Sequence, residues 1–494
     1  MRLNEGISFK PPDYSDAGNA NRLSVEYHGL LAFTDSLGWL WWNGKKWERN
    51  EHKATDKAVT LTENMTMEAL AELSAATYAE ADAKLAVAQK EDGAKERLEV
   101  AQKAVKAAKG YYAHALKSRN APRIRGMLDL AKPSFLIKAS MLDADPFLLN
   151  TPGGIVNLET GKVLPHDIDA PFKWCSQITA VAPGSKGAEM WIEFLDTVTC
   201  GDRSLAGFLQ MVAGMAAIGK VYHEGIFAAN GSGRNGKSTL FNAVAGVFGD
   251  YAGTIDVRTL TTDRQNKGAS LATLRGKRLV IASELEEHQR LSTSTLKQLA
   301  STDKLTIEEK FKAPETVDQT HTLVLYTNHL PRVGSTDNGT WRRLLVVPFN
   351  AVIPQGSGTQ NYADKLVKEA GPAIMSWIIQ GAMNFIKNDF KLIIPDCVEE
   401  ATEEYREREN WLENFINERC VREPDARIGS RDLYLEYKDW AQENGEFVRR
   451  ENDFAGAMEA AGYHKITPKG KKFWVGLRLV AAEYINNPMR KARF

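Results

Sequence analysis

Apolar and polar positions alternate in two different periods through the middle of the chain. Residues 226–349 switch repeatedly between short apolar runs and stretches of helical spacing, which predicts a parallel sheet with helices between its strands. The run at 225–229 is short enough to be a buried strand, and Leu240, Val244 and Val247 repeat at helical spacing after it. Three further apolar runs predict strands: residues 278–284, 322–326 and 344–348.

The N-terminal third has a different pattern. Residues 39–47 are rich in tryptophan around Asn43-Gly44, which predicts a hairpin with its turn at that pair. Residues 60–118 are rich in Ala, Glu and Lys, the composition of long exposed helices, with an interruption expected at Gly93. Further elements are expected as a helix over 123–132, two strands at 155–158 and 162–164, and helices over 191–197 and 205–218.

Beyond Pro395 a charged helical stretch leads to a small C-terminal region. Two segments of helical spacing, 430–444 and 451–461, precede two short strands that flank a basic turn. This order predicts a winged-helix-like α+β domain, whose turn could lie on a phosphate backbone. The alternative is a solubilising turn on a domain that docks a protein. The basic residues expected to contact DNA are Lys469, Lys471 and Lys472.

Composition adds few constraints. The 494 residues are enough for two to four domains, and 43% hydrophobic and 26% charged residues are ordinary for a globular protein. The net charge is zero, so DNA contact would have to come from local basic patches. The four cysteines form no C-x-x-C pair, which argues against a zinc site or a disulfide framework and fits a reducing cytoplasm. We find no signal peptide pattern and no apolar run of transmembrane length.

One octapeptide, residues 231–238, matches the phosphate-loop pattern G-x-x-x-x-G-K-[ST] between the first predicted strand and its helix. Its glycines let backbone N–H groups turn onto phosphate oxygens, and the new helix offers its positive end to the same anion. Lys237 is expected to reach the β- and γ-phosphates of ATP, and the Ser238 hydroxyl to hold Mg²⁺. A chance glycine-rich turn is the alternative. The expected nucleotide-binding residues are Gly231, Ser232, Gly233, Arg234, Asn235, Gly236, Lys237, Ser238 and Thr239.

Three later features suit ATP hydrolysis. The strand at 278–284 ends in acid, so Glu284 and the nearby Glu286 could orient Mg²⁺ and polarise the attacking water. The strand at 322–326 is followed by Asn328, which could bond the γ-phosphate or the water. Arg342 and Arg343 stand before the last strand, and one of them could reach a neighbouring subunit's ATP as an arginine finger. The alternatives are a solvated acidic turn for the two glutamates and plain surface charges for the two arginines.

The order of these motifs resembles superfamily III helicases, specifically the helicase portion of satellite-phage and poxvirus primase-helicases. The resemblance covers roughly residues 15–480 and is strongest over 145–349. It implies an AAA+-type ATPase that forms a ring, about six subunits in that family, and moves 3′ to 5′ along single-stranded DNA. The motifs that carry it are residues 145–150, 231–238, Glu284, 297–303, 327–332 and 340–343.

The resemblance also suggests where DNA is gripped. Residues 304–317 alternate as a hairpin should, and the family's DNA-contacting hairpin occupies this interval. Lys310 and Lys312 could contact phosphates and Phe311 could pack on a sugar or base, although an ordinary surface hairpin has the same pattern. The Asp143-Ala144-Asp145 triplet resembles the paired carboxylates of primases, but no partner motif follows. We therefore expect any primase or polymerase to be a separate partner.

The predicted fold is an α/β P-loop (AAA+-type) motor with a helical N-terminal region and a C-terminal winged-helix-like domain. The expected domains are residues 1–120, 121–205 (a collar-like pre-motor domain), 206–390 (the ATPase) and 391–494. The leading interpretation is a ring-forming helicase acting on single-stranded and forked DNA in phage, prophage or plasmid replication, in the cytoplasm of a bacterial host. An ATP-dependent initiator or loader that does not unwind processively, and a P-loop protein unrelated to DNA, remain open.

Overall fold

The structure is a computed structural model that describes residues 8–167, 174–261, 271, 273–283, 290–307, 315–333, 338–354 and 361–480. The chain forms two compact units, the first built mainly from residues up to Gly184 and the second mainly from residues after it. No helix in the described ranges combines the length and apolarity needed to cross a bilayer.

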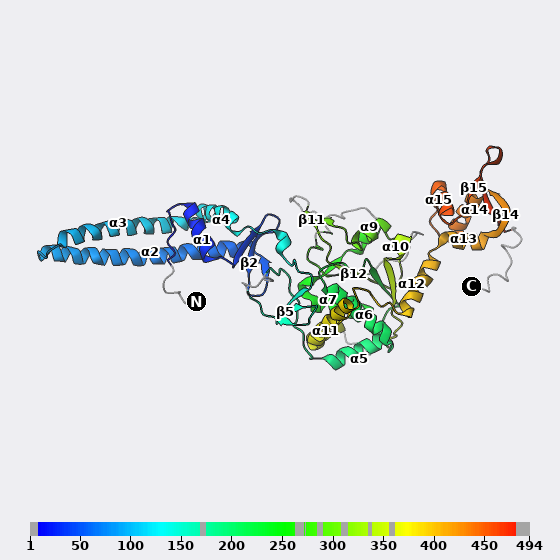
Figure 1. Ribbon diagram of the computed structural model, residues 1–494, viewed down its shortest axis with the longest axis horizontal. Helices are drawn as coiled ribbons and strands as arrows, with labels where there is room; N and C mark the ends of the chain where they lie inside the picture. Colours follow the sequence, from blue (N-terminus) through cyan, green and yellow to red (C-terminus); the bar gives the residue numbers. More distant parts are fainter. Residues whose placement is uncertain are drawn as a thin grey trace. The chain divides into compact units, whose positions relative to one another are not determined.

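The first unit contains a long helical hairpin next to a small sheet. Helices α2 (Glu51–Ala88) and α3 (Ala94–Ser118) run side by side (Figure 1), and Gly93 between them adopts φ +70°, a left-handed conformation. The predicted long helices and their interruption are therefore confirmed. The remaining elements of this half are α1 (Asp16–Glu26), β1 (Leu31–Thr34), β2 (Gly38–Trp42), β3 (Trp47–Arg49) and α4 (Ala121–Phe135).

The tryptophan-rich segment of the first unit folds as predicted. Strands β2 and β3 pair antiparallel across the Asn43-Gly44 turn, and Gly44 takes φ +96°. Trp47 is 1% exposed and stacks on Trp174 with ring centroids 4.9 Å apart, so the tryptophans build core rather than a binding surface. A second antiparallel sheet follows, made of β4 (Leu148–Thr151), β5 (Gly154–Asn157) and β6 (Val163–Leu164).

The second unit is built on the expected parallel sheet. Its strand order is β13-β7-β12-β9-β8, and all four neighbouring pairs are parallel. The strand before the phosphate loop, β7, therefore lies between β13 and β12, and β12 separates it from the strand that leads to Glu284. The strands are β7 (Ile226–Asn230), β8 (Ala252–Ile255), β9 (Leu279–Ser283), β12 (Thr322–Thr327) and β13 (Leu344–Pro348).

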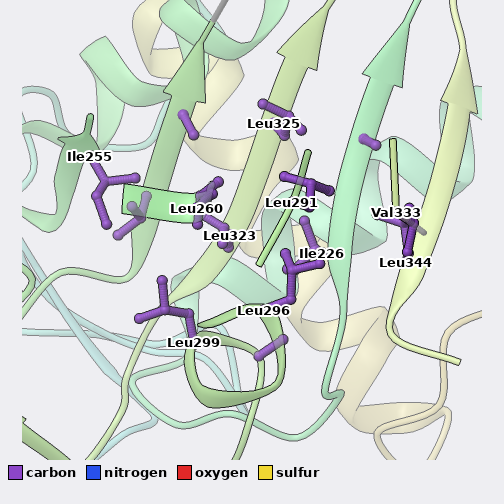
Figure 2. Close-up of a cluster of buried hydrophobic side chains, with 14 of the residues drawn as sticks. Ile226, Ile255, Leu260, Leu291, Leu296, Leu299, Leu323, Leu325, Val333 and Leu344 are labelled. Carbon is purple, nitrogen blue, oxygen red and sulfur yellow. The ribbon is translucent and has the colours of Figure 1, made fainter. Parts of the chain in front are cut away.

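Strands β7, β9, β12 and β13 are mostly buried on both faces, as continuous apolar strands require, whereas the edge strand β8 is buried only at Ile255. Figure 2 shows the side chains of one face, where Ile226, Leu323 and Leu325 from the strands pack with Leu296 and Leu299. The latter two come from α9 (Thr293–Leu299). On the other face, the ring of Phe227 meets that of Phe208 in α6 (Arg203–Ala217) at 6.0 Å. The sheet is therefore rigid enough to hold the loops at its carboxyl edge in place.

Helices surround the sheet and extend beyond it. The phosphate loop opens α7 (Lys237–Phe248), and the short α10 (Asn338–Trp341) precedes β13. Strands β10 (Leu305–Ile307) and β11 (Glu315–Val317) pair as a separate two-stranded sheet, as the predicted hairpin requires. The other helices of this part are α5 (Ala188–Val198), α11 (Tyr362–Lys387) and α12 (Asp396–Arg408).

The C-terminal region has its own core, centred on aromatic side chains such as Phe415, Tyr437 and Trp474. The two predicted helices and two predicted strands are present, but the sequence pattern missed β14 (Cys420–Gly429), which pairs with β16. Its run of charged residues around Pro424 hides a strand from a search for alternating apolar positions. The elements are α13 (Trp411–Arg419), β14, α14 (Ser430–Glu443), α15 (Glu451–Ala460), β15 (Lys465–Ile466) and β16 (Phe473–Leu479).

Candidate nucleotide site

The loop between β7 and α7 needs glycine for steric reasons. Gly233 and Gly236 adopt φ +97° and +79°, which residues with a Cβ rarely adopt. A Cβ on Gly236 would also lie 2.3 Å from Cγ1 of Val198, a distance no real side chain tolerates. Arg234, which lies between them, takes φ +51° and is exposed. The loop is therefore a fixed turn rather than a flexible glycine-rich segment.

Lys237 is the first residue of α7, and only 6% of it is exposed. Its Nζ donates to Oδ1 of Asn328 at 2.6 Å, to the carbonyl oxygen of Gly231 at 3.1 Å and to Oδ1 of Asn235 at 3.3 Å. Burial lowers the pKa of this lysine below its ordinary value. Three neutral oxygens thus hold the ammonium at the sheet edge, close to where the phosphate loop turns.

Two asparagines fix the loop to the neighbouring strand ends. Asn235 is 1% exposed, and its Nδ2 donates to the carbonyl oxygen of Phe349, the residue after β13, at 3.0 Å. Asn230 at the end of β7 donates to the carbonyl oxygen of Asn328 at 3.3 Å. The register that pairs Asn230 with Thr327 brings these groups together. Lys237 and Asn328, each expected separately to act at the terminal phosphates, are therefore adjacent although far apart in sequence.

Several of the residues expected to meet phosphate and metal are accessible, although Asn235, Gly236 and Lys237 are buried. Ser232 and Ser238 are exposed, and Gly231 and Thr239 are partly exposed. A hydroxyl at the start of a helix, next to a buried lysine and a fixed glycine turn, fits the donor set that nucleotide and Mg²⁺ require. Glu284 and Glu286 lie outside the described residues. Strand β9 ends at Ser283, which pairs with Tyr326 of β12.

The two arginines before β13 have different environments. Arg343 has a side chain that is 12% exposed; it donates to the carbonyl oxygens of Ala300 at 3.0 Å and Gly339 at 2.8 Å, and its guanidinium pairs closely with Glu224. Arg342 has a side chain that is 68% exposed and lies 3.6 Å from the same carboxylate. Arg343 is therefore held by its own chain, whereas Arg342 is accessible to another molecule.

A cavity of about 360 Å³ lies beside Arg342. It is formed where α10 meets α12, a helix that no sequence motif singled out. Its lining includes Trp341 and Arg406, whose Nη2 donates to Oδ1 of Asn338 at 2.9 Å. The motif at residues 340–343 predicts half of this site. The half from α12 was missed, because that helix has only the pattern of a charged helix and its partners lie more than fifty residues away.

The candidate DNA contacts fall into two groups, and the structure describes only one of them. Lys310, Phe311 and Lys312 lie outside the described residues, between the two paired strands of the predicted hairpin. In the C-terminal turn, Lys469, Lys471 and Lys472 are exposed. Two other basic residues of that stretch are paired within the chain: Lys465 with Glu459 at 3.3 Å and Arg478 with Glu423 at 2.6 Å. Of the five basic residues in this stretch, three lysines therefore have no ion pair among the described residues.

Comparisons with known proteins match both halves of the chain. A family described as "D5 N terminal like" matches residues 20–200, and a family of unknown function (DUF5906) matches residues 229–343. A candidate helicase of Acanthamoeba polyphaga mimivirus is 26% identical over 347 residues, which is 65% of this chain and 35% of the relative. A candidate primase of African swine fever virus (strain Badajoz 1971 Vero-adapted) is 25% identical over 328 residues, 61% of this chain and 34% of that protein.

Among solved structures, the apo form of the C-terminal region of NrS-1 is similar, with a TM-score of 0.38 and 14% identity. The match covers 60% of this chain and 77% of that one. The chain spans about a third of the length of the viral relatives named above.

Proposed function

We propose that this chain, a relative of the D5-like viral primase-helicases, is the ATP-driven motor of a DNA helicase. The matches over residues 20–200 and 229–343 confirm the family resemblance that the motifs predicted. The named relatives are candidate helicases and primases of large DNA viruses, which favours nucleic acid as the substrate of the motor.

One contact supports the proposal most strongly, the 2.6 Å hydrogen bond from Lys237 Nζ to Asn328 Oδ1. It joins the lysine that binds phosphate to the polar residue at the tip of the adjacent strand. A group at this position can distinguish ATP from ADP, because it lies beside the ammonium that contacts the terminal phosphates. A phosphate loop alone binds nucleotide, whereas hydrolysis also needs groups placed at the terminal phosphate, as this asparagine is.

The remaining roles follow from chemistry. Ser238 would hold Mg²⁺, whose charge would offset that of the phosphates, and Glu284, with Glu286 near it, would orient the attacking water. Gly231 to Thr239 provide the backbone cradle, and the helix end of α7 adds a positive dipole. The fold of this part is that of an AAA+-type motor.

We assign the arginine finger to Arg342 rather than Arg343. A finger must be free to approach ATP bound by a neighbouring subunit, and the Arg342 side chain is 68% exposed. The Arg343 guanidinium already donates to Ala300 and Gly339 and pairs with Glu224, so it holds the base of the element that presents Arg342. This assignment requires self-association into a ring, for which six subunits and 3′-to-5′ movement are expectations from the family.

DNA is gripped in two places. The segment between β10 and β11 carries Lys310, Phe311 and Lys312, which combine phosphate-binding charge with a stacking ring. The C-terminal region acts as a winged-helix-like domain whose turn brings Lys469, Lys471 and Lys472 to the phosphate backbone. A separate primase or polymerase would supply the new strand.

Strand displacement on a forked duplex tests this function. We expect the purified chain to release the labelled strand with ATP and Mg²⁺, and to release none with a non-hydrolysable ATP analogue. Retention of duplex DNA on a filter with no displacement would instead identify an initiator or loader. ATP hydrolysis that DNA does not change would contradict both readings.

A further inference from the structure

Helix α12 contributes nothing to the sequence motifs, yet its side chains reach both loops that carry the proposed nucleotide contacts. Tyr405 is 2% exposed and belongs to the core under the sheet. Its hydroxyl donates to the carbonyl oxygen of Pro331, three residues after Asn328. Its ring meets Trp341 edge to face at 5.4 Å, directly before Arg342. A single side chain therefore touches the segments that carry both Asn328 and Arg342.

Neighbouring residues attach the same helix to the same elements. The carboxylate of Glu409, just past the end of α12, accepts from the backbone N–H of Val333 at 2.8 Å. The Thr402 hydroxyl accepts from the backbone N–H of Val346 in β13 at 2.9 Å. Because both acceptors bond backbone groups, they fix the path of the chain and not merely a side chain.

The path from Tyr405 to the nucleotide site is short. Pro331 lies three residues after Asn328, a span of at most about 11 Å. The hydroxyl of Thr327, directly before Asn328, donates to the carbonyl oxygen of His329 at 2.8 Å, which holds the turn at the end of β12 in place. Burial raises the pKa of Tyr405, so its hydroxyl stays protonated and remains a donor.

We propose that Tyr405 is a positioning residue for ATP hydrolysis, which holds Asn328 through Pro331 and Arg342 through Trp341. The inference rests on the proposed function, since it assigns these two residues their roles in turnover. Helix α12 ends two residues before α13 begins the C-terminal region. Arg332, next to Pro331, also donates to the carbonyl oxygen of Gly445 at 3.0 Å in that region. Through these contacts, a shift of the C-terminal region reaches both nucleotide loops.

The experiment compares Tyr405→Phe with Tyr437→Phe in the full chain. Tyr437 is a matched control, because it is equally buried and its hydroxyl donates to the carbonyl oxygen of Phe447 at 3.0 Å, within the C-terminal core. Each variant keeps its ring and loses a buried donor hydroxyl. Tyr437→Phe also removes an acceptor of the Arg449 backbone N–H at 3.2 Å and of Arg449 Nη1 at 3.4 Å, so its melting temperature should fall at least as far as that of Tyr405→Phe. We expect Tyr405→Phe to lower kcat for ATP about tenfold with KM little changed, and Tyr437→Phe to leave kcat at the wild-type value.

A second pair of variants keeps the inference testable if Tyr405→Phe folds poorly. Glu409→Gln retains an oxygen that accepts from Val333, whereas Glu409→Ala removes it. We expect the glutamine variant to keep wild-type kcat and the alanine variant to lose several-fold. Equal kcat in Tyr405→Phe, Glu409→Ala and the wild type overturns the inference, as does an equal loss in both tyrosine variants.

The outcomes separate this inference from the function on which it rests. Wild-type turnover that DNA stimulates, combined with an unaffected Tyr405→Phe, removes only the positioning role. Wild-type protein that hydrolyses no ATP removes the proposed function and the positioning role together.

Discussion

The phosphate loop and the C-terminal basic turn both offer lysines to an anion, but they are built differently. Lys237 is buried, and three oxygens from two strands' loops surround its ammonium. Lys469, Lys471 and Lys472 are exposed, and Gly470 among them has nothing within 4 Å of where a Cβ would lie. Hydrogen bonds fix the position of the lysine in the first site, whereas the second site offers only positive charge at the surface. Substitutions in the two regions should therefore have effects of very different size and kind.

Lys237→Ala should have the largest effect. Loss of the ammonium removes the main positive charge facing the β- and γ-phosphates, so we expect ATP turnover to fall to background, at least about ten-thousandfold. Steady-state ATP hydrolysis measures this. Lys472→Ala is the matched control and should keep full turnover without DNA; a comparable loss there would erase the contrast between the regions.

Arg342→Ala should come next and should differ from Arg343→Ala. Loss of an arginine finger costs about a thousandfold in kcat, while binding of a fluorescent ATP analogue should persist. Arg343→Ala leaves the Glu224 carboxylate without its closest partner and should lower the melting temperature as well as turnover. If Arg342→Ala hydrolyses ATP normally, the assignment of the finger to that side chain is wrong.

A glycine pair compares the backbones of the two turns. Gly236 and Gly470 have nearly the same φ, +79° and +81°. Alanine costs about 1 kcal/mol at either position for its left-handed backbone. At Gly236 the Cβ would also meet Val198, which adds about 2 kcal/mol. Urea denaturation should therefore show the larger loss for Gly236→Ala; equal losses would mean that the phosphate loop is no more constrained than the basic turn.

The smallest effect is expected from replacing Lys469, Lys471 and Lys472 together with glutamine. Affinity for single-stranded DNA should fall, and the slope of log K against log salt should drop by about 2, because three phosphate contacts are lost. ATP turnover without DNA should not change. Fluorescence anisotropy over a salt series measures the slope, and an unchanged slope would exclude the turn as a DNA contact.

The same contrast explains what the sequence could predict. The phosphate loop was found from eight residues because its chemistry is local: glycine at left-handed turns, then lysine and serine at a helix start. The five-stranded parallel sheet followed from apolar runs that need no partner to be recognised. The order of motifs along the chain predicts a role for Asn328, and the structure places its Oδ1 2.6 Å from the Nζ of Lys237. The assignment of its role stays a prediction, as do those of Glu284 and Glu286.

The features that could not be predicted from the sequence depend on contacts between residues far apart in the chain. Strand β14 pairs with β16 despite its charged residues, because its partner supplies the ladder hydrogen bonds and the core needs few of its side chains. Tyr405 lies in a charged helix whose pattern predicts a solvated surface, and Glu409 follows its last residue. Nothing in the local sequence shows that they contact Pro331 and Val333. The different burial of Arg342 and Arg343 likewise depends on Glu224, which is more than a hundred residues away.

ATP hydrolysis with and without single-stranded DNA, for wild type and Lys237→Ala side by side, tests the central claim most directly. The account predicts clear stimulation of the wild type by DNA and none in the variant, because one motor couples the nucleotide site to the DNA contacts. Wild-type hydrolysis that is the same with and without DNA would contradict it and would point to a P-loop enzyme that acts on something else.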